Sequence, residues 1–377
     1  MPVNEIYFLV QRPVEQRDYE RFGVSRLRNK GIKAGFIDMT SLLNPEIKHE
    51  RRGFDCPIFY VGKKADLLTF FENNDANNML IIDLIGRRDM IPIYQIFSEQ
   101  NVGFASFCAN SIPSSPGISV RSMFSPGRIA GYIRNKFNNA GVQLAHPRYI
   151  LAGGRKYINK YPPAGKNIRI IWAHTLDYDL YLDYKSRSPE PAEKGEYAVF
   201  LDEYFPLHPD FFVSGIGKNP YSDYRQYYLE INLMFKQIEA VSGLKVVIAA
   251  HPRAQYASLP DVFEGRKLIK GNTVNLVANA KLVLAHASTS LNFAVLFNKP
   301  VVFLAPEKVR GGYYGILIRS FARNMGKKPY LLAELETIDI ENEMVLDPVA
   351  YEAYRENYIK TIGSQDKHFW DIVAEAI

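Results

Sequence analysis

The apolar residues of this chain fall into short runs that end in turn residues, with stretches of helical spacing between them. Runs of this length suit strands that are buried on both faces, and their alternation with helices predicts parallel sheets. The runs are Ile6–Val10, Lys33–Met39, Met79–Asp83, Phe104–Cys108, Ile168–Trp172, Tyr197–Leu201, Val246–Ala250, Leu282–Ala285 and Val301–Leu304. The expected helices include Val14–Asn29, Met90–Gln100, Arg128–Asn138, Tyr221–Val241, Pro348–Ile362 and Lys367–Ala376.

One segment divides this pattern in two. Lys160–Lys166 reads KYPPAGK, and its two prolines and one glycine are typical of a linker. The alternation of strand and helix restarts at Ile168. We therefore expect two α/β domains, residues 1–160 and 165–345, with a ligand site in a cleft that they share.

Composition narrows the class of protein. The 377 residues are enough for two domains of ordinary size, and no apolar stretch approaches the length of a membrane span. The first residues do not form a signal peptide, and Cys56 and Cys108 are too few for a disulfide framework or a cysteine zinc site. A reducing cytoplasm is the expected compartment. The net charge of +6 permits an acidic partner, but without repeated RGG or zinc-finger spacing it does not indicate nucleic acid.

Two polar motifs follow strands of one predicted sheet that lie about one βαβ unit apart in the sequence. His251-Pro252-Arg253 comes directly after Val246–Ala250, and Ser288-Thr289-Ser290 comes shortly after Leu282–Ala285. Ligands of parallel sheets bind at the carboxyl ends of the strands. An imidazole, a guanidinium and three hydroxyls all donate hydrogen bonds, so the pair of motifs predicts a phosphate site in which His251 could also be a general acid.

The hydroxyl motif has a simpler explanation as well. Ser and Thr are preferred helix N-caps, and an apolar helical pattern starts at Leu291. Three consecutive hydroxyls exceed what one cap requires, which favours the phosphate site. His286, at the start of the same segment, either points toward the ligand or is a hydrogen-bonded core residue.

Acidic residues supply candidates for a general base. Asp202 and Glu203 follow the strand Tyr197–Leu201, and alternation sends the two side chains to opposite sides, so that one of them can face the ligand. A helix cap or an ion pair is the alternative role. Asp177 and Asp179 form a second acidic pair, which spells the D-x-D pattern of a metal site.

Other motifs are weaker or missing. His208-Pro209-Asp210 has no strand directly before it and is interpreted as structural, and His146-Pro147-Arg148 is interpreted as a turn. There is no phosphate-binding P-loop, no dinucleotide fingerprint, no nucleophile elbow and no zinc spacing of histidines. These absences exclude the commonest nucleotide hydrolases, dehydrogenases and serine hydrolases.

The order of an acidic pair, an HP motif and a Ser/Thr motif resembles the bacterial sialyltransferases of GT-B architecture and related transferases of capsule and lipopolysaccharide synthesis. His251-Pro252 matches the HP motif, Ser288-Thr289-Ser290 matches the Ser/Thr motif, and Asp202-Glu203 matches the acidic motif in part, with Tyr204 where the family has glycine. The resemblance covers Tyr197–Pro306. It implies two Rossmann-like domains that face a central cleft, with a C-terminal helix, residues 365–377, packed back on the N-terminal domain.

The resemblance also implies a function. The chain would move an acidic sugar of the sialic, legionaminic, pseudaminic or Kdo type from a CMP donor to a glycan or lipid-linked glycan, without a metal or other cofactor and in the cytoplasm or at the membrane surface. In this reading Asp202 or Glu203 is the base, and His251, Pro252, Arg253, His286, Ser288, Thr289 and Ser290 hold the donor. A UDP-sugar transferase or epimerase, and a non-catalytic scaffold that binds glycans, are the alternatives.

Overall fold

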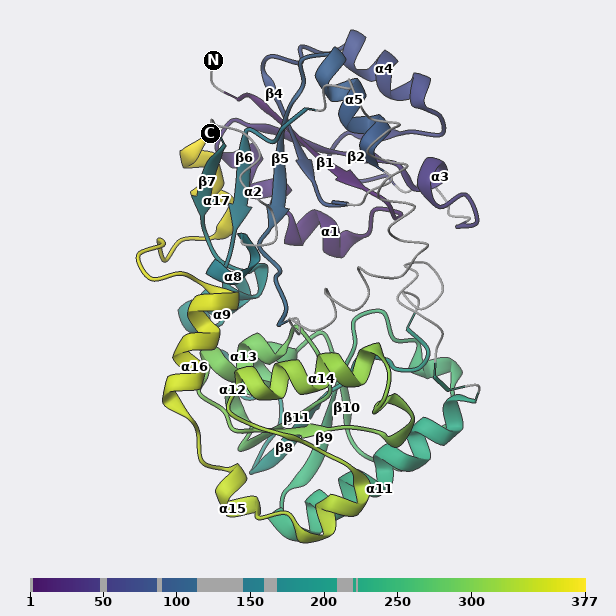
Figure 1. Ribbon diagram of the computed structural model, residues 1–377, viewed down its shortest axis with the longest axis vertical. Coiled ribbons are helices and arrows are strands. Elements are labelled where there is room, and N and C mark those ends of the chain that lie inside the picture. Colours follow the sequence, from purple (N-terminus) through teal and green to yellow (C-terminus); the bar gives the residue numbers. More distant parts are fainter. Residues whose placement is uncertain are drawn as a thin grey trace, which may run out of the picture. The chain divides into compact units, whose positions relative to one another are not determined.

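The chain consists of two compact units, each with its own sheet (Figure 1). The computed structural model describes residues 3–47, 53–86, 90–113, 145–158, 168–208, 220–221 and 223–377. The first unit comprises Met1–Ser111, Gly117–Leu176 and Lys360–Ile377, and the second comprises Ile112–Pro116 and Asp177–Ile359. The predicted linker Lys160–Lys166 and the predicted helix Arg128–Asn138 lie outside the described residues.

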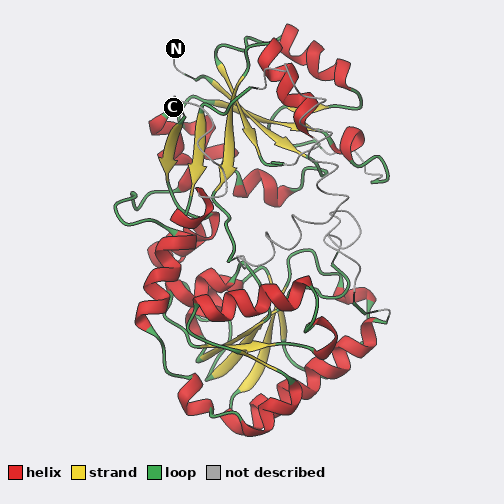
Figure 2. Ribbon diagram, in the orientation of Figure 1, coloured by secondary structure: helices red, strands yellow, loops and turns green. Residues whose placement is uncertain are grey.

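The first unit is built on a seven-stranded sheet in the order β3-β2-β1-β4-β5-β6-β7, and all neighbouring strands are parallel. The chain starts in the middle and winds outward in both directions, which is the doubly wound topology of nucleotide-binding folds. Helices flank the strands (Figure 2). The strands are β1 (Glu5–Val10), β2 (Lys33–Asp38), β3 (Ile58–Tyr60), β4 (Met79–Asp83), β5 (Gly103–Cys108), β6 (Tyr149–Ala152) and β7 (Arg169–Trp172).

The domain boundary is not where the sequence placed it. Strand β7, which we assigned to the second domain, pairs with β6 at the edge of the first sheet. The division falls after Leu176, so the expected boundary at residues 160–165 was wrong. Proline and glycine favour any turn-rich connection, so their presence in the sequence was not enough to locate a domain boundary.

A second difference concerns the predicted helix Val14–Asn29, which is two helices in the structure. The break lies at Gly23, whose φ of 59° is in the left-handed region that favours glycine. The indole of Trp370 fills the space beside it, and a Cβ at Gly23 would come within 2.5 Å of the ring. The helices of this unit are α1 (Gln16–Arg21), α2 (Val24–Asn29), α3 (Thr40–Leu43), α4 (Lys64–Glu72), α5 (Ile91–Glu99), α8 (Arg155–Ile158) and α17 (Phe369–Ala376).

The last helix, α17, belongs to the first unit, although more than 180 residues of the second unit precede it in the sequence. It packs against α2 and β7, and Figure 1 shows it beside the strands of that sheet. Trp370 is fully buried, its ring meets Phe8 edge to face at 4.9 Å, and its indole N–H donates to the carbonyl of Arg21 at 3.3 Å. The two ends of the chain therefore complete one core.

The second unit has a six-stranded parallel sheet in the order β10-β9-β8-β11-β12-β13. The four strands that the sequence predicted here after residue 190 are all present, and they are completely buried apart from Lys245 at the start of β9. The strands are β8 (Tyr197–Leu201), β9 (Lys245–Ala250), β10 (Leu268–Lys270), β11 (Leu282–Ala285), β12 (Val301–Leu304) and β13 (Pro329–Tyr330). Strand β8 lies at the centre, and the chain leaves it in both directions.

The helices of the second unit are α9 (Leu176–Arg187), α11 (Tyr224–Ser242), α12 (Thr273–Asn279), α13 (Leu291–Leu296), α14 (Tyr313–Asn324), α15 (Ile340–Glu343) and α16 (Pro348–Tyr354). The short turns are Tyr256–Ser258, Glu307–Val309, Leu332–Thr337 and the π-helical Arg355–Ile359. Within the described ranges, no helix is both long and apolar enough to cross a membrane.

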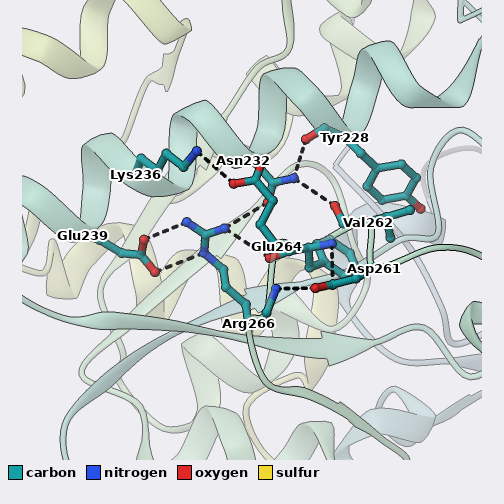
Figure 3. Close-up of polar contacts among 10 residues, drawn as sticks. Tyr228, Asn232, Lys236, Glu239, Asp261, Val262, Glu264 and Arg266 are labelled. Atoms are coloured by element: carbon teal, nitrogen blue, oxygen red, sulfur yellow. Dashed lines mark hydrogen bonds and ion pairs between the residues drawn. The ribbon is translucent and has the colours of Figure 1, made fainter.

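Helix α11 is fastened to the segment before β10 by Arg266 (Figure 3). The guanidinium makes two hydrogen bonds to the Glu239 carboxylate, at 3.1 and 2.7 Å, and a third to the amide oxygen of Asn232 at 3.0 Å. Burial raises the pKa of Glu239, but the hydrogen bonds from Arg266 and from the Val246 N–H outweigh it and lower that pKa overall. This network lies where the strands begin, so the opposite edge of the sheet is left to the loops that carry the predicted motifs.

Candidate functional site

The three predicted motifs of the second unit meet at the carboxyl edge of its sheet. Strand β8 lies between β9 and β11, and all three run parallel. Asp202-Glu203 follows β8, His251-Pro252-Arg253 follows β9, and the segment from His286 to Ser290 follows β11. Strand order reverses beside β8, and this switch point is where doubly wound sheets bind their ligands.

The HP loop, His251-Pro252-Arg253, is a tight turn with a half-buried histidine. The Arg253 N–H donates to Nδ1 of His251 at 3.2 Å, and the Ala254 N–H donates to the His251 carbonyl at 2.9 Å. An Nδ1 that accepts a hydrogen bond assigns the proton of the neutral ring to Nε2. His251 is thus held as a hydrogen-bond donor at the sheet edge, which suits a ligand phosphate.

A second histidine lies beside the first. The rings of His208 and His251 are 4.7 Å apart between centroids, at an interplanar angle of 74°. The sequence analysis interpreted His208 as structural because no strand precedes it directly. Pro209 and Asp210 lie outside the described residues. The repeated His-Pro dipeptide was the one signal that could have placed His208 in the site, which now offers two imidazoles.

The hydroxyl loop, Ser288-Thr289-Ser290, forms the turn before α13. The Ser290 N–H donates to Oγ of Ser288 at 3.2 Å, whereas Ser290 itself, at the N-cap position, makes no capping hydrogen bond with its side chain. Thr289 is exposed, and its two neighbours are half-buried. Helix α13 has only six residues, so the hydroxyls, and not a helix dipole, are what this loop offers to an anion.

The acidic pair is buried rather than open to the site. Asp202 is 4% exposed and Glu203 is 8% exposed. Oδ2 of Asp202 accepts from the His251 N–H at 3.0 Å and from the Tyr256 hydroxyl at 2.8 Å, and Oδ1 accepts from the Tyr204 N–H at 2.8 Å. Oε1 of Glu203 accepts from the Ala287 N–H and Oε2 from the Tyr314 hydroxyl, both at 2.7 Å.

Burial raises the pKa values of these two carboxyls. It raises the pKa of Glu203 to about 7, although the hydrogen bonds from the Ala287 N–H and the Tyr314 hydroxyl oppose the shift. It also raises the pKa of Asp202, against the hydrogen bonds from His251, Tyr256 and Tyr204. Removing charge from water favours the neutral acid, while each donor favours the carboxylate.

His286 is a core residue. Of the two interpretations, a side chain that points toward the ligand or a hydrogen-bonded core residue, the structure favours the second. The side chain is 2% exposed. Nδ1 lies 2.6 Å from the carbonyl of Leu304 and Nε2 lies 2.9 Å from the hydroxyl of Tyr227, so both ring nitrogens are engaged inside the unit. Burial lowers the pKa of His286 to about 4, which keeps the ring neutral. Its expected place among the phosphate ligands was therefore wrong.

The D-x-D pattern lies on the first turn of α9. Residues two apart on a helix point to different sides, so Asp177 and Asp179 cannot share one ion. Oδ2 of Asp177 accepts a hydrogen bond from the side-chain amide of Asn292 at 2.8 Å, which ties α9 to α13. Among the described residues, no cluster of His, Cys, Asp and Glu is arranged to hold a metal ion.

The first unit has a hollow of its own, with a volume of about 270 Å³. It lies near the carboxyl ends of β4 and β5, and its floor is supported from behind, because Phe107 stacks on Trp370 and meets Phe369 edge to face. The lining residues are Arg21, Phe22, Leu84, Phe107, Cys108 and Asn110. Two aromatic rings, a guanidinium and an amide are thus presented together at the ligand-binding edge of the sheet.

Comparison with known proteins gives a fold. No family model matches the sequence, and no curated protein matches it. Solved structures do match. One of them is MurG of Acinetobacter baumannii, which matches at 10% identity and a TM-score of 0.52, with 100% of this chain and 99% of that chain covered. The wall teichoic acid polymerase TagF follows at 12% and 0.52, covering 99% and 88%, and the calicheamicin glycosyltransferase CalG4 at 11% and 0.50, covering 94% and 93%.

The chain has the GT-B fold. Its two doubly wound parallel sheets and the coverage of nearly the whole MurG chain confirm the fold class expected from the sequence. At identities near 10% the likeness extends to the fold alone, and the sialyltransferase resemblance stays a prediction.

Proposed function

We propose that this GT-B protein is a glycosyltransferase that takes a sugar from a nucleotide-activated donor held at the carboxyl edge of the second sheet. One observation supports it above all: the HP loop and the hydroxyl loop flank the central strand at the switch point. Imidazole, guanidinium and hydroxyl donors gathered at that place suit the phosphate of a nucleotide.

In the proposed reaction an acceptor hydroxyl attacks the anomeric carbon, and the bond from that carbon to the donor phosphate breaks. The nucleotide leaves with the electron pair, and His251, Arg253 and the hydroxyls of the second loop stabilise the charge on its phosphate. Because these groups supply the donors, the proposed step needs no metal. The burial of Asp202 and Glu203 favours a more accessible group, such as a carboxylate of α9, as the acceptor of that proton.

For the donor we propose a cytidine nucleotide. The resemblance to sialyltransferases implies CMP, and one TagF structure, which matches at a TM-score of 0.53, was soaked with CDPG. An acidic sugar on CMP is the finer form of this proposal. The UDP-dependent transferase or epimerase is the alternative, and the non-catalytic scaffold is a third possibility.

A nucleotide screen tests the donor. We expect CMP or CDP to raise the melting temperature of the protein, because a ligand at a hundred times its Kd stabilises the folded state by about 2.7 kcal/mol. EDTA should leave the shift unchanged. Stabilisation by UDP alone would favour the UDP-sugar alternative, and no response to any nucleotide would contradict the proposed function. Hydrolysis of a bound nucleotide sugar without acceptor separates an enzyme from a scaffold.

For the acceptor we propose the hollow of the first unit. The aromatic rings of Phe22 and Phe107 suit the apolar face of a sugar, and Arg21 suits the phosphate of a lipid-linked glycan. A hexose 1-phosphate is the probe. Saturation-transfer NMR should show that Arg21→Gln weakens its binding about tenfold or more, while Arg17→Gln, on the same helix but not in the lining, leaves it unchanged. Equal binding by both variants would place the acceptor elsewhere.

A further inference from the structure

The central strand of the second sheet ends in two consecutive carboxylates that serve different neighbours. Asp202 accepts a hydrogen bond from the backbone of the HP loop on the β9 side, at the N–H of His251. Glu203 accepts one from the backbone that leads into the hydroxyl loop on the β11 side, at the N–H of Ala287. The opposite directions of consecutive side chains on an extended backbone explain this division.

We propose that Asp202 and Glu203 are a pair of positioning residues, which hold the HP loop and the hydroxyl loop in register with each other. The inference rests on the proposed function, because it assigns a role in the same phosphate site. It replaces the sequence-based expectation that one of the two is the general base. A base must reach the reacting hydroxyl, whereas both carboxylates are buried and each of their four oxygens accepts a hydrogen bond from within the unit.

Two tyrosines extend the arrangement. The Tyr256 hydroxyl donates to the same oxygen of Asp202 as the His251 N–H, so the turn after the HP loop is tied to β8 as well. The Tyr314 hydroxyl donates to Glu203 from the first turn of α14. Glu203 thereby joins the loop after β11 to the helix that follows β12, and two loops and one helix depend on one strand end.

The first turn of α14 packs closely against the turn that precedes it. Gly315, on its first turn, lies against the carbonyls of Val309 and Arg310, and a Cβ there would come within 2.3 and 2.4 Å of the two oxygens. The backbone therefore needs glycine at this position, so that the turn Glu307–Val309 can pack against the start of the helix that carries Tyr314.

The test measures binding of CMP and CDP by calorimetry in Asp202→Asn, Glu203→Gln and Glu203→Leu. Removing a charge-assisted hydrogen bond to a loop backbone should weaken nucleotide binding roughly ten- to a hundredfold. Gln keeps an acceptor oxygen, so Glu203→Gln should lose less than Glu203→Leu. A general base would behave differently, because its loss slows transfer and leaves nucleotide binding at the wild-type value.

Glu343→Gln is the matched control. Glu343 is a buried glutamate of the same unit that also accepts from a tyrosine, Tyr330, at 2.7 Å, but it lies in α15 and not at the site. It should lower thermal stability in the same way as Glu203→Gln while nucleotide binding stays unchanged. Equal loss of binding in both would show that the effect is one of general stability, and the proposal would be wrong.

A second measurement is independent of the nucleotide. Amide hydrogen exchange reports the hydrogen bonds of Ala287 and His251 directly, and it should become faster at Ala287 in Glu203→Leu and at His251 in Asp202→Leu, because leucine keeps no acceptor oxygen. If the wild type binds neither nucleotide but exchange changes as expected, the donor assignment fails and the positioning role stands. Unchanged exchange at both amides would refute the positioning role itself.

Discussion

Replacement of His251 by alanine is expected to lower sugar transfer by roughly 10²–10⁴-fold, which is the range for loss of a positioned proton donor. The variant removes the ring that the HP loop presents at the sheet edge, with its proton on Nε2. Nucleotide binding should weaken as well, by roughly ten- to a hundredfold, because a charge-assisted hydrogen bond to the phosphate is lost. Calorimetry with CMP or CDP and an assay of nucleotide release measure the two effects separately.

The chain contains a matched control for this variant. His146-Pro147-Arg148 repeats the same tripeptide in the first unit, where His146 is exposed at the turn before β6. We expect His146→Ala to retain both binding and turnover. His208→Asn should have an intermediate effect, since His208 lies against His251. If His251→Ala and His146→Ala behave alike, His251 is not part of the site.

The second large effect concerns pH. The pKa of Glu203 is about 7 in the folded protein and near 4.5 when unfolded, so between these values the folded state binds the additional proton. Stability contributed by this group is therefore fully present below about pH 4.5 and is lost as the pH rises through about 7. The difference between the folded and unfolded pKa values corresponds to about 3 kcal/mol in the free energy of unfolding.

Thermal melts at a series of pH values measure this loss. Glu203→Gln cannot ionise and should flatten the fall in stability between pH 5 and pH 8. Glu239→Gln should change the pH dependence of stability in the opposite direction, because hydrogen bonds lower the pKa of Glu239 in the folded protein. The stability that Glu239 contributes is present above its pKa in the unfolded chain. It is lost as the pH falls through the lower pKa of the folded protein. A wild-type profile without any decline toward pH 8 would show that Glu203 is not a buried acid of raised pKa.

The fold was accessible from the sequence because buried strands leave a strong local signal. Tyr197–Leu201 and Leu282–Ala285 are continuous apolar runs, and the structure has strands with those same bounds. Residues after such strands lie at one edge of a parallel sheet, so the sequence could assign His251 and Ser288 to the same edge, and their convergence on one phosphate stays a prediction. The same alternation of strands and helices predicted two α/β units, whereas the GT-B class was expected from the family resemblance.

What the sequence could not give depends on contacts between distant residues. His208 is brought to His251 by a turn that no local pattern encodes. The carboxylate of Glu203 is held inside the unit by hydrogen bonds from Ala287 and Tyr314, which are 84 and 111 residues further along the chain. The two ring nitrogens of His286 are engaged in the same way by the carbonyl of Leu304 and the hydroxyl of Tyr227. Residue type predicted the chemistry of these side chains, but only packing decides which of them a ligand can reach.

The place of α17 has a consequence for the order in which the chain can fold during synthesis. Nearly all of the second unit is one continuous segment, Asp177–Ile359, whereas the first unit also needs Lys360–Ile377, which follows that segment in the sequence. Until the ribosome releases that segment, Phe8 and Gly23 lack the indole of Trp370 that covers them. The unit whose translation starts first is thus completed after the second, and the nascent first sheet exposes an apolar surface until Lys360–Ile377 has been translated. A chain shortened by its last helix would remain permanently in that state.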